Sequence, residues 1–139
     1  MLENGNECSD MKILPFFSVL DPKEQALVFA TDTENKSRIC VISTNIAETS
    51  VTIPNVKYVV DCGKVKLKSY DSLMGSSKYA VDWISQASAD QRAGRAGRMS
   101  EGYVYRLYTQ ALYGHMAKFT QPELLRCPIN QIVLELKVI

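Results

Sequence analysis

The chain has 139 residues, which is enough for one domain with a hydrophobic core and too few for two ordinary domains. Its hydrophobic content of 46% and charged content of 22% are typical of globular proteins, and a formal net charge of +1 excludes nucleic-acid binding through bulk positive charge. Acidic residues dominate residues 1–34, however, whereas lysine and arginine dominate residues 57–98. This asymmetry predicts a local anion-binding face.

Cysteine usage and hydropathy narrow the class of protein further. The 4 cysteines are widely spaced, without a C-x-x-C pair, so a metal site is not predicted. Cys40 and Cys62 lie in or beside apolar runs, which predicts core residues of a reduced, intracellular protein. No apolar stretch reaches the roughly 18–20 residues that cross a bilayer, and residues 1–10 do not resemble a signal peptide. We therefore expect a protein of the cytosol or nucleus without a membrane partner.

The first half of the chain predicts strands that alternate with short helices. Residues 1–10 are polar and predict a disordered leader, and the apolar residues 13–20 predict a buried strand interrupted by a proline. Asp21 predicts a helix N-cap, with proline at the first helical position. Residues 38–43 and 56–61 are short apolar runs typical of parallel strands covered on both faces. Together these elements predict βαβ units and a parallel sheet.

Residues 64–84 predict a β-hairpin that projects from this sheet. Val65 and Leu67 alternate with lysines, so the two apolar residues share one face of the first strand. The second strand carries a set of apolar side chains that we expect to form a matching face: Tyr79, Val81 and Trp83.

The second half predicts two further helices and a strand. Ser88 and Gln91 have the spacing of a capping box, which predicts a helix that continues through Arg98. Residues 102–108 predict a strand, and Thr109 and Thr120 each have the setting of an N-cap. Past Pro128 the apolar residues recur at helical spacing without a stop signal, which we interpret as a fragment of a longer protein.

The segment QRAGRAGR, residues 91–98, carries the most information. On a continuous helix Gln91, Arg95 and Arg98 project from one face, and Arg92 points about a quarter-turn away. Two glycines cost a short helix about 1 kcal/mol each. Glycines allow another surface to approach the backbone, and clustered guanidinium groups suit phosphate oxygens. The alternative is a solvated basic face whose arginines pair with nearby acids.

Residues 91–98 resemble motif VI of superfamily-2 helicases in its DEAH-box form, and residues 44–53 resemble motif V of that branch. Residues 13–20 resemble motif IV, and residues 64–84 occupy the place of the family's β-hairpin. The resemblance implies an α/β, RecA-like second motor domain over residues 11–127, truncated at its start. Residues 128–139 would begin the connection to a winged helix. The sequences of residues 61–66 and 85–98 are similar to those of the ribosome-biogenesis members of the family.

The resemblance implies an ATP site between two RecA-like domains. Arg95 and Arg98 would be arginine fingers on the phosphates, and Gln91 would orient the attacking water. Phe29 would stack on adenine. Two further residues would face the nucleotide: Ser50 and Thr52. Two alternatives remain: Gln91 as only the capping-box partner of Ser88, and Phe29 as an ordinary core residue.

The resemblance also implies a track for the RNA backbone, whose contacts carry no base information. Ser18, Thr44 and Asn45 would hold phosphate or sugar, although Thr44 and Asn45 fit plain N-caps equally well. Lys66 and Lys68 would meet the backbone, unless these lysines only discourage edge pairing of the strand. Tyr79 and Trp83 are interpreted as hairpin packing rather than base-stacking platforms, and the single histidine, His115, receives no role.

Neither a Walker-A loop nor a D-E-A-H run occurs in the chain. The resemblance therefore places the Mg²⁺ ligands and the phosphate loop on a first RecA-like domain outside the sequence, and we expect this chain alone to be inactive. Implied partners are RNA, that first domain, the winged-helix region and an activating cofactor protein. The implied location is the nucleus or nucleolus. The alternative function is a shortened, non-catalytic relic that binds RNA or protein.

Overall fold

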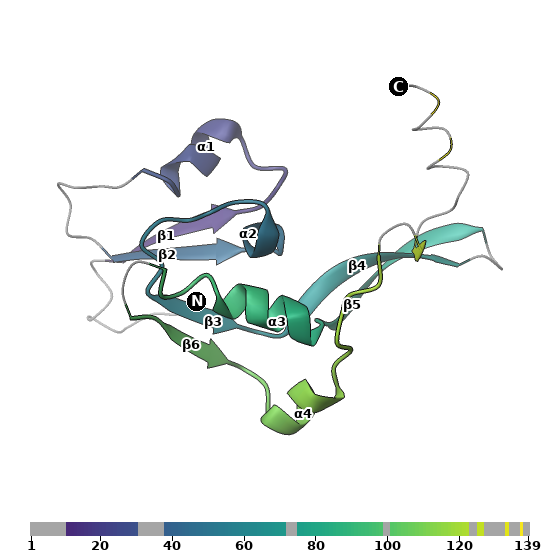
Figure 1. The fold of residues 1–139 in the computed structure, drawn as a ribbon. Coiled ribbons are helices and arrows are strands. Elements are labelled where there is room, and N and C mark those ends of the chain that lie inside the picture. The colour runs from purple at the N-terminus through teal and green to yellow at the C-terminus, as the bar shows by residue number, and fades with distance from the viewer. Residues whose placement is uncertain are drawn as a thin grey trace, which may run out of the picture. The chain divides into compact units, whose positions relative to one another are not determined.

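The computed structural model describes residues 11–30, 38–71, 75–98, 101–122, 125–126, 133 and 137. The chain divides into two compact units, residues 1–56 and residues 57–139, and each is described by itself. Element labels follow Figure 1. Among the described helices none is long and apolar enough to cross a membrane.

The first unit contains two parallel strands and two short helices. Strand β1 (Met11–Phe16) pairs with β2 (Arg38–Ser43), with Met11 opposite Arg38 and Phe16 opposite Ser43. Helix α1 (Pro22–Leu27) lies between them in the sequence, and α2 (Ile46–Thr49) follows β2 (Figure 1). The order strand, helix, strand confirms the predicted parallel βαβ arrangement.

The core of the first unit lies on one face of this strand pair. Leu14 and Phe16 alternate along β1 and are buried together with Val28. Several partly buried side chains pack against them: Val41, Ile46, Ala47, Val51 and Ile53. The opposite face carries Ile13 and Ile42, which are 59% and 62% exposed. The prediction of strands covered on both faces was therefore wrong for the residues that the structure describes.

Local signals placed helix α1 correctly but misplaced the end of β1. The Asp21 carboxylate accepts a hydrogen bond from the Lys23 backbone nitrogen at 2.8 Å, which confirms the predicted N-cap. The strand predicted over residues 13–20 instead ends at Phe16, because the chain turns at once toward α1: the Leu20 nitrogen donates to the Phe17 carbonyl at 3.2 Å.

The second unit has a parallel strand pair, a hairpin and two helices. Strand β3 (Tyr58–Asp61) pairs with β6 (Tyr103–Arg106), which places Asp61 opposite Arg106. Both strands are shorter than the predicted ranges 56–61 and 102–108. Helix α3 (Gln86–Ala93) packs on β3, and α4 (Gln110–His115) follows β6.

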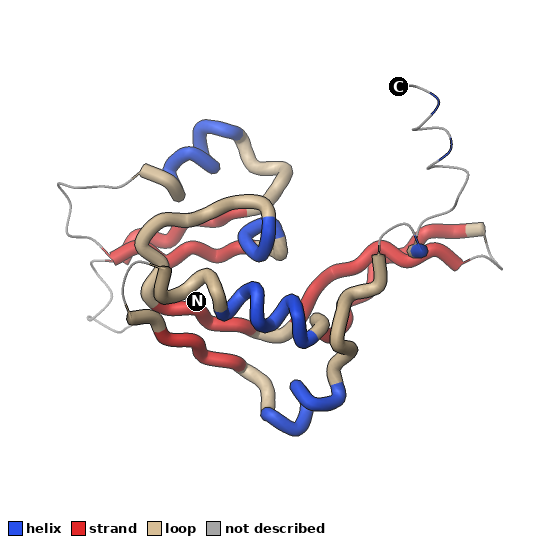
Figure 2. The backbone as a smooth tube through the Cα atoms, viewed as in Figure 1, coloured by secondary structure: helices blue, strands red, loops and turns tan. Residues whose placement is uncertain are grey.

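The hairpin consists of β4 (Lys64–Asp71) and β5 (Ser76–Trp83), which run antiparallel beside each other (Figure 2). This confirms the predicted hairpin, but the predicted matching apolar face was wrong. Directly opposed residues share a face of an antiparallel pair, and three lysines oppose the apolar set of β5: Lys64 to Trp83, Lys66 to Val81 and Lys68 to Tyr79. The lysines therefore lie beside the large side chains of β5.

The core of the second unit lies where α3 and α4 meet the root of the hairpin. Ile84, Ala89 and Met116 are buried, and Val65, Tyr108, Leu112 and Tyr113 pack against them. The segment after α4 is held to the start of α3, because the Gln86 and Ala87 nitrogens donate to the carbonyls of Ala117 and Lys118.

Of the three predicted caps in this unit, one is confirmed, one was wrong, and that of Thr120 involves Glu123, which lies outside the described residues. Thr109 accepts from the Leu112 nitrogen at 3.1 Å, which confirms the N-cap of α4. Ser85, and not Ser88, caps α3 by accepting from the Ser88 nitrogen at 3.1 Å. Thr120 donates its hydroxyl to Ser85 Oγ at 2.9 Å, so its side chain supports α3. Of the helix predicted after Pro128, the described positions 133 and 137 are helical, and the rest lies outside the described residues.

Candidate nucleotide and nucleic-acid site

Helix α3 ends before the arginines that were expected to lie along it. Gly94 caps the helix after Ala93, and Gly97 has a left-handed φ of +76°. The backbone continues in turns, with the Arg95 nitrogen donating to the Arg92 carbonyl at 3.1 Å. The prediction of a helix through Arg98 was therefore wrong, because glycine readily leaves the helical conformation. Gln91 belongs to the last turn of α3, whereas Arg95 and Arg98 lie in a loop beyond it.

We call residues 94–98 the arginine loop. This loop has a close neighbour just before β6: a methyl group on Gly102 would lie 2.3 Å from the Gly97 nitrogen. The surface that approaches this glycine is thus the chain itself, just before β6. Arg95 is half-buried, whereas Arg98 is exposed and its Nε donates to the Gly94 carbonyl at 3.5 Å.

The N-terminal end of α3 decides between the two interpretations of Gln91. Because Ser85 is the N-cap, Gln91 does not occupy the capping-box position relative to it. Ser88 instead places its Oγ 3.4 Å from Thr120 Oγ1. The capping alternative for Gln91 is therefore not supported, and its exposed side chain remains a predicted phosphate-facing group.

Sequence reasoning missed a buried carboxylate beside this loop. Asp61 ends β3 and has a side chain only 1% exposed, and Arg92 Nη1 donates to its Oδ1 at 2.8 Å. The Tyr108 hydroxyl donates to Asp61 Oδ2 at 2.8 Å, and the Gly63 nitrogen donates to Oδ1 at 2.9 Å. A signal was present in the sequence, since an aspartate that closes an apolar strand needs buried donors.

This environment perturbs a tyrosine. Burial, together with the hydrogen bond to Asp61 and the charge of that carboxylate, raises the pKa of Tyr108 from 10.0 to about 12. The phenol is therefore a hydrogen-bond donor throughout the physiological pH range.

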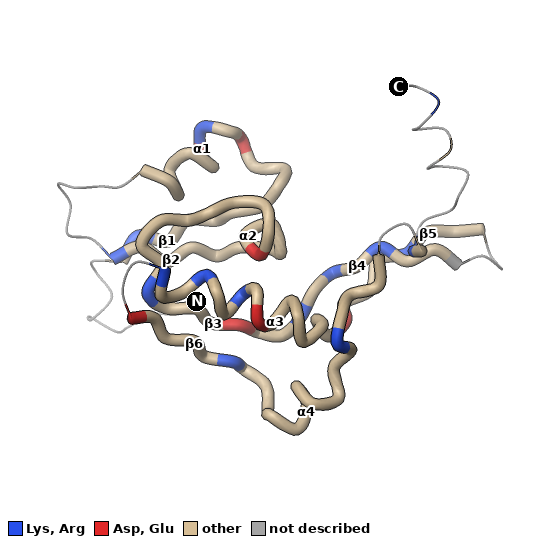
Figure 3. Tube along the Cα trace, viewed as in Figure 1, with Lys and Arg blue, Asp and Glu red and all other residues tan. Residues whose placement is uncertain are grey.

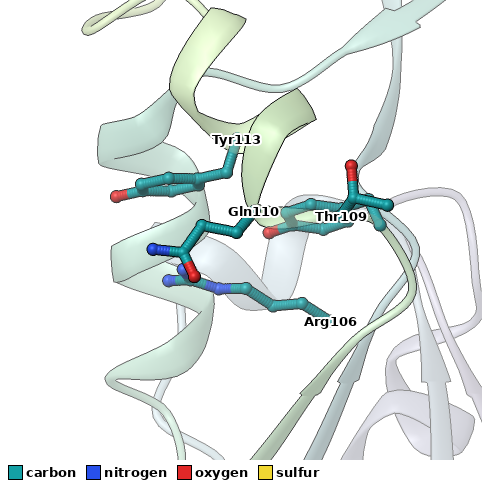
Figure 4. Close-up of a pocket in the computed structure, with 5 residues that line it drawn as sticks. Arg106, Thr109, Gln110 and Tyr113 are labelled. Carbon is teal, nitrogen blue, oxygen red and sulfur yellow. The ribbon is translucent and has the colours of Figure 1, made fainter.

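A second aspartate holds the far side of α3. Asp90 accepts from Arg106 Nη2 at 2.9 Å and from the Tyr113 hydroxyl at 3.1 Å. The Arg106 guanidinium lies 4.6 Å from the centre of the Tyr113 ring, and both side chains extend toward α3 (Figure 4). Arg106 and Tyr113 line an open pocket of about 280 Å³ together with three other residues: Tyr108, Thr109 and Gln110. Because Asp90 already balances the Arg106 charge, this pocket offers little attraction to an anion.

The predicted nucleotide-facing residues of the first unit lie around its core. Phe29 follows the end of α1, and its ring meets the buried Phe16 edge-to-face at 5.6 Å while remaining 37% exposed. It is thus neither a fully buried core residue nor a free platform. Ser50 caps the C-terminal end of α2, and Thr52 follows in the extended segment; both are exposed.

The predicted RNA-facing residues of this unit lie near the carboxyl ends of β1 and β2. The Thr44 nitrogen continues the strand pairing by donating to the Phe16 carbonyl at 3.2 Å. Asn45 begins α2, but within the described residues its side chain makes no capping hydrogen bond. Ser18 lies in the exposed turn after β1. The alternative of a plain side-chain N-cap is therefore not supported for Asn45.

The hairpin presents a basic and aromatic face. Basic positions follow one another along β4 (Figure 3), with Lys64 Nζ 3.1 Å from the centre of the Trp83 ring. Lys66 Nζ lies 5.2 Å from the centre of the Tyr79 ring. Lys66 is exposed and Lys68 half-buried, whereas Tyr79 is 65% exposed. Trp83 therefore serves hairpin packing, as predicted, but Tyr79 extends mainly into solvent.

Two other predictions concern a metal site, which was not expected, and the core positions of Cys40 and Cys62. In the described part of the chain no group of three or more His, Cys, Asp or Glu side chains is placed to hold a metal ion. Cys40 is half-buried but Cys62 is exposed, so the prediction of a core position was wrong for Cys62. Cys62 lies in the turn between β3 and β4, where the neighbouring Asp61 takes the buried position.

The family model described as helicase conserved C-terminal domain matches residues 1–100. This chain belongs to that family. Every predicted site residue of the helicase C-terminal domain lies within the matched range.

Individual relatives place the domain in the DEAH-box branch. It is 49% identical over 141 residues to probable ATP-dependent RNA helicase DHX37 of Homo sapiens, covering 99% of this chain and 12% of that protein. It is 45% identical over 139 residues to probable ATP-dependent RNA helicase DHR1 of Saccharomyces cerevisiae, covering 99% and 11%. The helicase C-terminal domain thus spans about a tenth of the length of these relatives.

A solved structure confirms the fold. The crystal structure of the Escherichia coli DEAH/RHA helicase HrpB matches with a TM-score of 0.82 and 30% sequence identity, covering 92% of this chain and 16% of that one. The expectation of a RecA-like α/β fold with an antiparallel hairpin is therefore confirmed for the helicase C-terminal domain.

Proposed function

We propose that this domain is one half of the motor of an ATP-dependent RNA helicase, in which it supplies arginine fingers to the nucleotide and part of the track for the RNA backbone. The observation that carries the proposal is the position of Arg95 and Arg98. Both leave the end of α3 in a loop shaped by Gly94 and Gly97. The relatives' names, which include the words ATP-dependent RNA helicase, support the same activity.

The arginine loop suits stabilisation of phosphate charge. Hydrolysis of ATP builds negative charge on the oxygens of the transferred phosphoryl group, and a positioned guanidinium stabilises that charge. An arginine finger contributes about 10³–10⁵ in rate. Gln91, exposed on the last turn of α3, would orient the attacking water. Gly97 allows the left-handed turn that takes the chain out of α3 beside these guanidinium groups.

Residues of the first unit would also bind ATP. Phe29 exposes part of its ring and would stack on the adenine, which does not require recognition of base edges. Ser50 and Thr52 would respond to the state of the phosphates from the segment after α2. The described residues show no carboxylate cluster for Mg²⁺, and the Mg²⁺ ligands are expected on the first RecA-like domain.

The RNA track would use contacts to phosphate and sugar. Asn45 keeps its amide out of helix capping, and Thr44 and Ser18 lie near the same ends of β1 and β2. Lys66 and Lys68 would add backbone contacts along the hairpin. Contacts to phosphate and sugar do not distinguish the bases, so binding should be largely independent of the RNA sequence.

The proposal includes partners outside the sequence. A first RecA-like domain, a winged-helix region and an activating cofactor protein would complete the machine, with this domain over residues 11–127 and the connection over residues 128–139. The similarity of residues 61–66 and 85–98 to ribosome-biogenesis members supports RNA remodelling in ribosome biogenesis, in the nucleus or nucleolus.

The decisive experiment compares ATP hydrolysis and RNA binding in the full-length protein. Arg95→Ala and Arg98→Ala should each lower turnover at least 10³-fold and change the Kd for poly-uridine RNA less than about three-fold. Arg126→Ala is the matched control, because that guanidinium donates to the backbone carbonyls of Gln121 and Lys68. Equal loss of RNA binding in the two variants would assign the arginines to the RNA backbone. Full turnover in both would remove the assignment of Arg95 and Arg98 as arginine fingers, whereas absence of ATP hydrolysis in the wild-type protein would favour a non-catalytic binding module.

A further inference from the structure

Asp61 connects three elements of the second unit that are far apart in the sequence. Its carboxylate closes β3 and accepts from Arg92 on α3 and from Tyr108 just after β6. The distances are 2.8 Å in both cases, and the carboxylate side chain is 1% exposed. Hydrogen bonds to a buried charge are stronger than neutral ones, so this cluster fixes its members firmly.

The root of the hairpin is bound into the same cluster. Lys64 is the first residue of β4, and its carbonyl accepts from both Nη1 and Nη2 of Arg92 at 3.3 Å. The Gly63 nitrogen donates to Asp61, and the Gly63 carbonyl accepts from the Ile84 nitrogen at 3.0 Å, directly after β5. Trp83 meets the Tyr108 ring edge-to-face at 6.5 Å. Both strands of the hairpin therefore begin or end on this cluster.

The opposite side of the cluster leads to the arginine loop. Arg92 lies one residue before the end of α3, and its carbonyl accepts from the Arg95 nitrogen at 3.1 Å. Arg92 thus contacts the hairpin root through its side chain and Arg95 through its backbone carbonyl. A displacement of the Lys64 carbonyl would act on Arg92, and a displacement of Arg92 would act on the arginine loop.

We propose that Asp61, Arg92 and Tyr108 are positioning residues that couple the hairpin to the arginine loop, so that RNA held by the hairpin places Arg95 and Arg98 for ATP hydrolysis. This inference rests on the proposed function. RNA that engages the exposed face of β4 pulls on the strand from its far end, and the strand is anchored at Lys64. Asp61 is buried and holds Arg92 by a hydrogen bond of 2.8 Å. A shift of the Lys64 carbonyl would therefore move Arg92. None of the three residues contacts ATP or RNA in this scheme.

The experiment uses Tyr108→Phe in the full-length protein, because this change removes one hydroxyl and keeps the ring that fills the core. Tyr113→Phe is the matched control: that hydroxyl also donates to an aspartate, but to Asp90 of α3 and not to Asp61. ATP turnover is measured with and without saturating poly-uridine RNA, together with the melting temperature and the Kd for the RNA.

Tyr108→Phe should lower the stimulation by RNA, the ratio of the two turnover rates, at least three-fold. Turnover without RNA and the Kd should each stay within two-fold, and Tyr113→Phe should keep the wild-type ratio. A purely structural role would lower both turnover rates together and leave the ratio unchanged. Arg92→Lys, which keeps the charge but cannot reach Asp61 and the Lys64 carbonyl with the same two-pronged geometry, should reproduce the loss of stimulation.

The outcomes separate the coupling from the proposed function. A wild-type protein without RNA-stimulated ATP hydrolysis would overturn the proposed function, and the coupling with it. Wild-type stimulation that Tyr108→Phe and Arg92→Lys leave intact, or that Tyr113→Phe reduces equally, would overturn the coupling alone.

Discussion

Gly102 lies directly against the backbone of Gly97, close enough that a methyl group on Gly102 would stand 2.3 Å from the Gly97 nitrogen and 2.7 Å from its Cα. This contact brings the start of β6 against the arginine loop. The obstructing atoms belong to the backbone, so they cannot rotate away as a flexible side chain would. The shape of the loop therefore depends on a residue outside the QRAGRAGR segment.

Gly102→Ala should displace the arginine loop and reduce ATP turnover of the full-length protein by about 10²-fold, the cost of misplacing a catalytic group by roughly 1 Å. RNA affinity should stay within about three-fold of wild type. Gly114→Ala is the control, since a methyl group there meets nothing within 4 Å. If both variants hydrolyse ATP equally fast, the contact between Gly102 and Gly97 does not control the position of the arginine loop.

Gly63 is constrained twice, by its φ of +70° and by the Tyr108 ring, whose Cδ1 would lie 2.6 Å from an added methyl group. Gly75 has a φ of +63° but its nearest neighbour would be 4.0 Å away. Gly75→Ala should cost about 1 kcal/mol from the left-handed conformation alone. Gly63→Ala should cost roughly 3 kcal/mol or more because strain and overpacking add. Urea unfolding of both variants measures the difference, and equal losses would contradict the close packing at Gly63.

The raised pKa of Tyr108 predicts a loss of stability at alkaline pH. Burial and the bond to Asp61 raise the pKa of Tyr108 from 10.0 to about 12, so the folded state holds the phenolic proton more tightly than the unfolded state. The stabilisation is fully present below pH 10 and is lost as the pH rises through about 12. Wild type should therefore lose roughly 2 kcal/mol of unfolding free energy over this window relative to Tyr108→Phe. Parallel pH curves for the two proteins would show that Tyr108 is not perturbed.

Asn45 and Ser85 both begin helices, but only Ser85 uses its side chain as a cap among the contacts that the structure describes. Ser85→Ala should cost about 1 kcal/mol or slightly more. Asn45→Ala should leave the melting temperature nearly unchanged while weakening binding of the full-length protein to poly-uridine RNA. A clear drop in stability for Asn45→Ala, without a change in RNA affinity, would return Asn45 to a structural role.

The two faces of the hairpin allow a charge-matched comparison. Lys66 and Lys68 lie on the aromatic face, whereas Lys78 opposes Ser69 on the other face. Lys66→Ala and Lys68→Ala should each weaken RNA binding for every sequence tested and reduce the salt slope of log K by about 1. Lys78→Ala should leave that slope unchanged. Binding titrations of poly-uridine and poly-adenine over a range of salt concentrations measure both effects, and an equal change for all three lysines would indicate nonspecific charge.

The caps show which structural features local sequence can predict. Asp21 and Thr109 were placed correctly because each cap accepts a hydrogen bond from a residue two or three positions later. The prediction of Ser88 as the cap was wrong, because α3 begins earlier, with Ser85 as its N-cap. Ser85 also accepts a hydrogen bond from Thr120, 35 positions along the chain, which no local pattern predicts.

The hairpin and the arginine loop show a similar division. Alternation along residues 64–84 predicted both strands, but the register determines which residues share a face, and that placed the lysines beside Trp83 and Tyr79. Glycine content and clustered arginines predicted a phosphate-binding segment, and helical periodicity then extended α3 too far. The helix ends at Ala93: Gly94 follows as the C-cap with right-handed φ and ψ, and Gly97 takes a left-handed φ of +76°.

The sequence by itself determined the family, the alternation of strands and helices, the hairpin and the residues proposed to meet ATP and RNA, because these depend on motifs and on spacing within a few residues. Tertiary structure alone decided that Asp61 is buried against Arg92 and Tyr108, and that Gly102 touches Gly97. Arg92 and Tyr108 lie 31 and 47 positions from Asp61, and the contact of Gly102 with Gly97 depends on how the chain turns between α3 and β6. No local pattern specifies them, because a buried charge or a close backbone contact is stable only once folding has excluded water and brought both partners together.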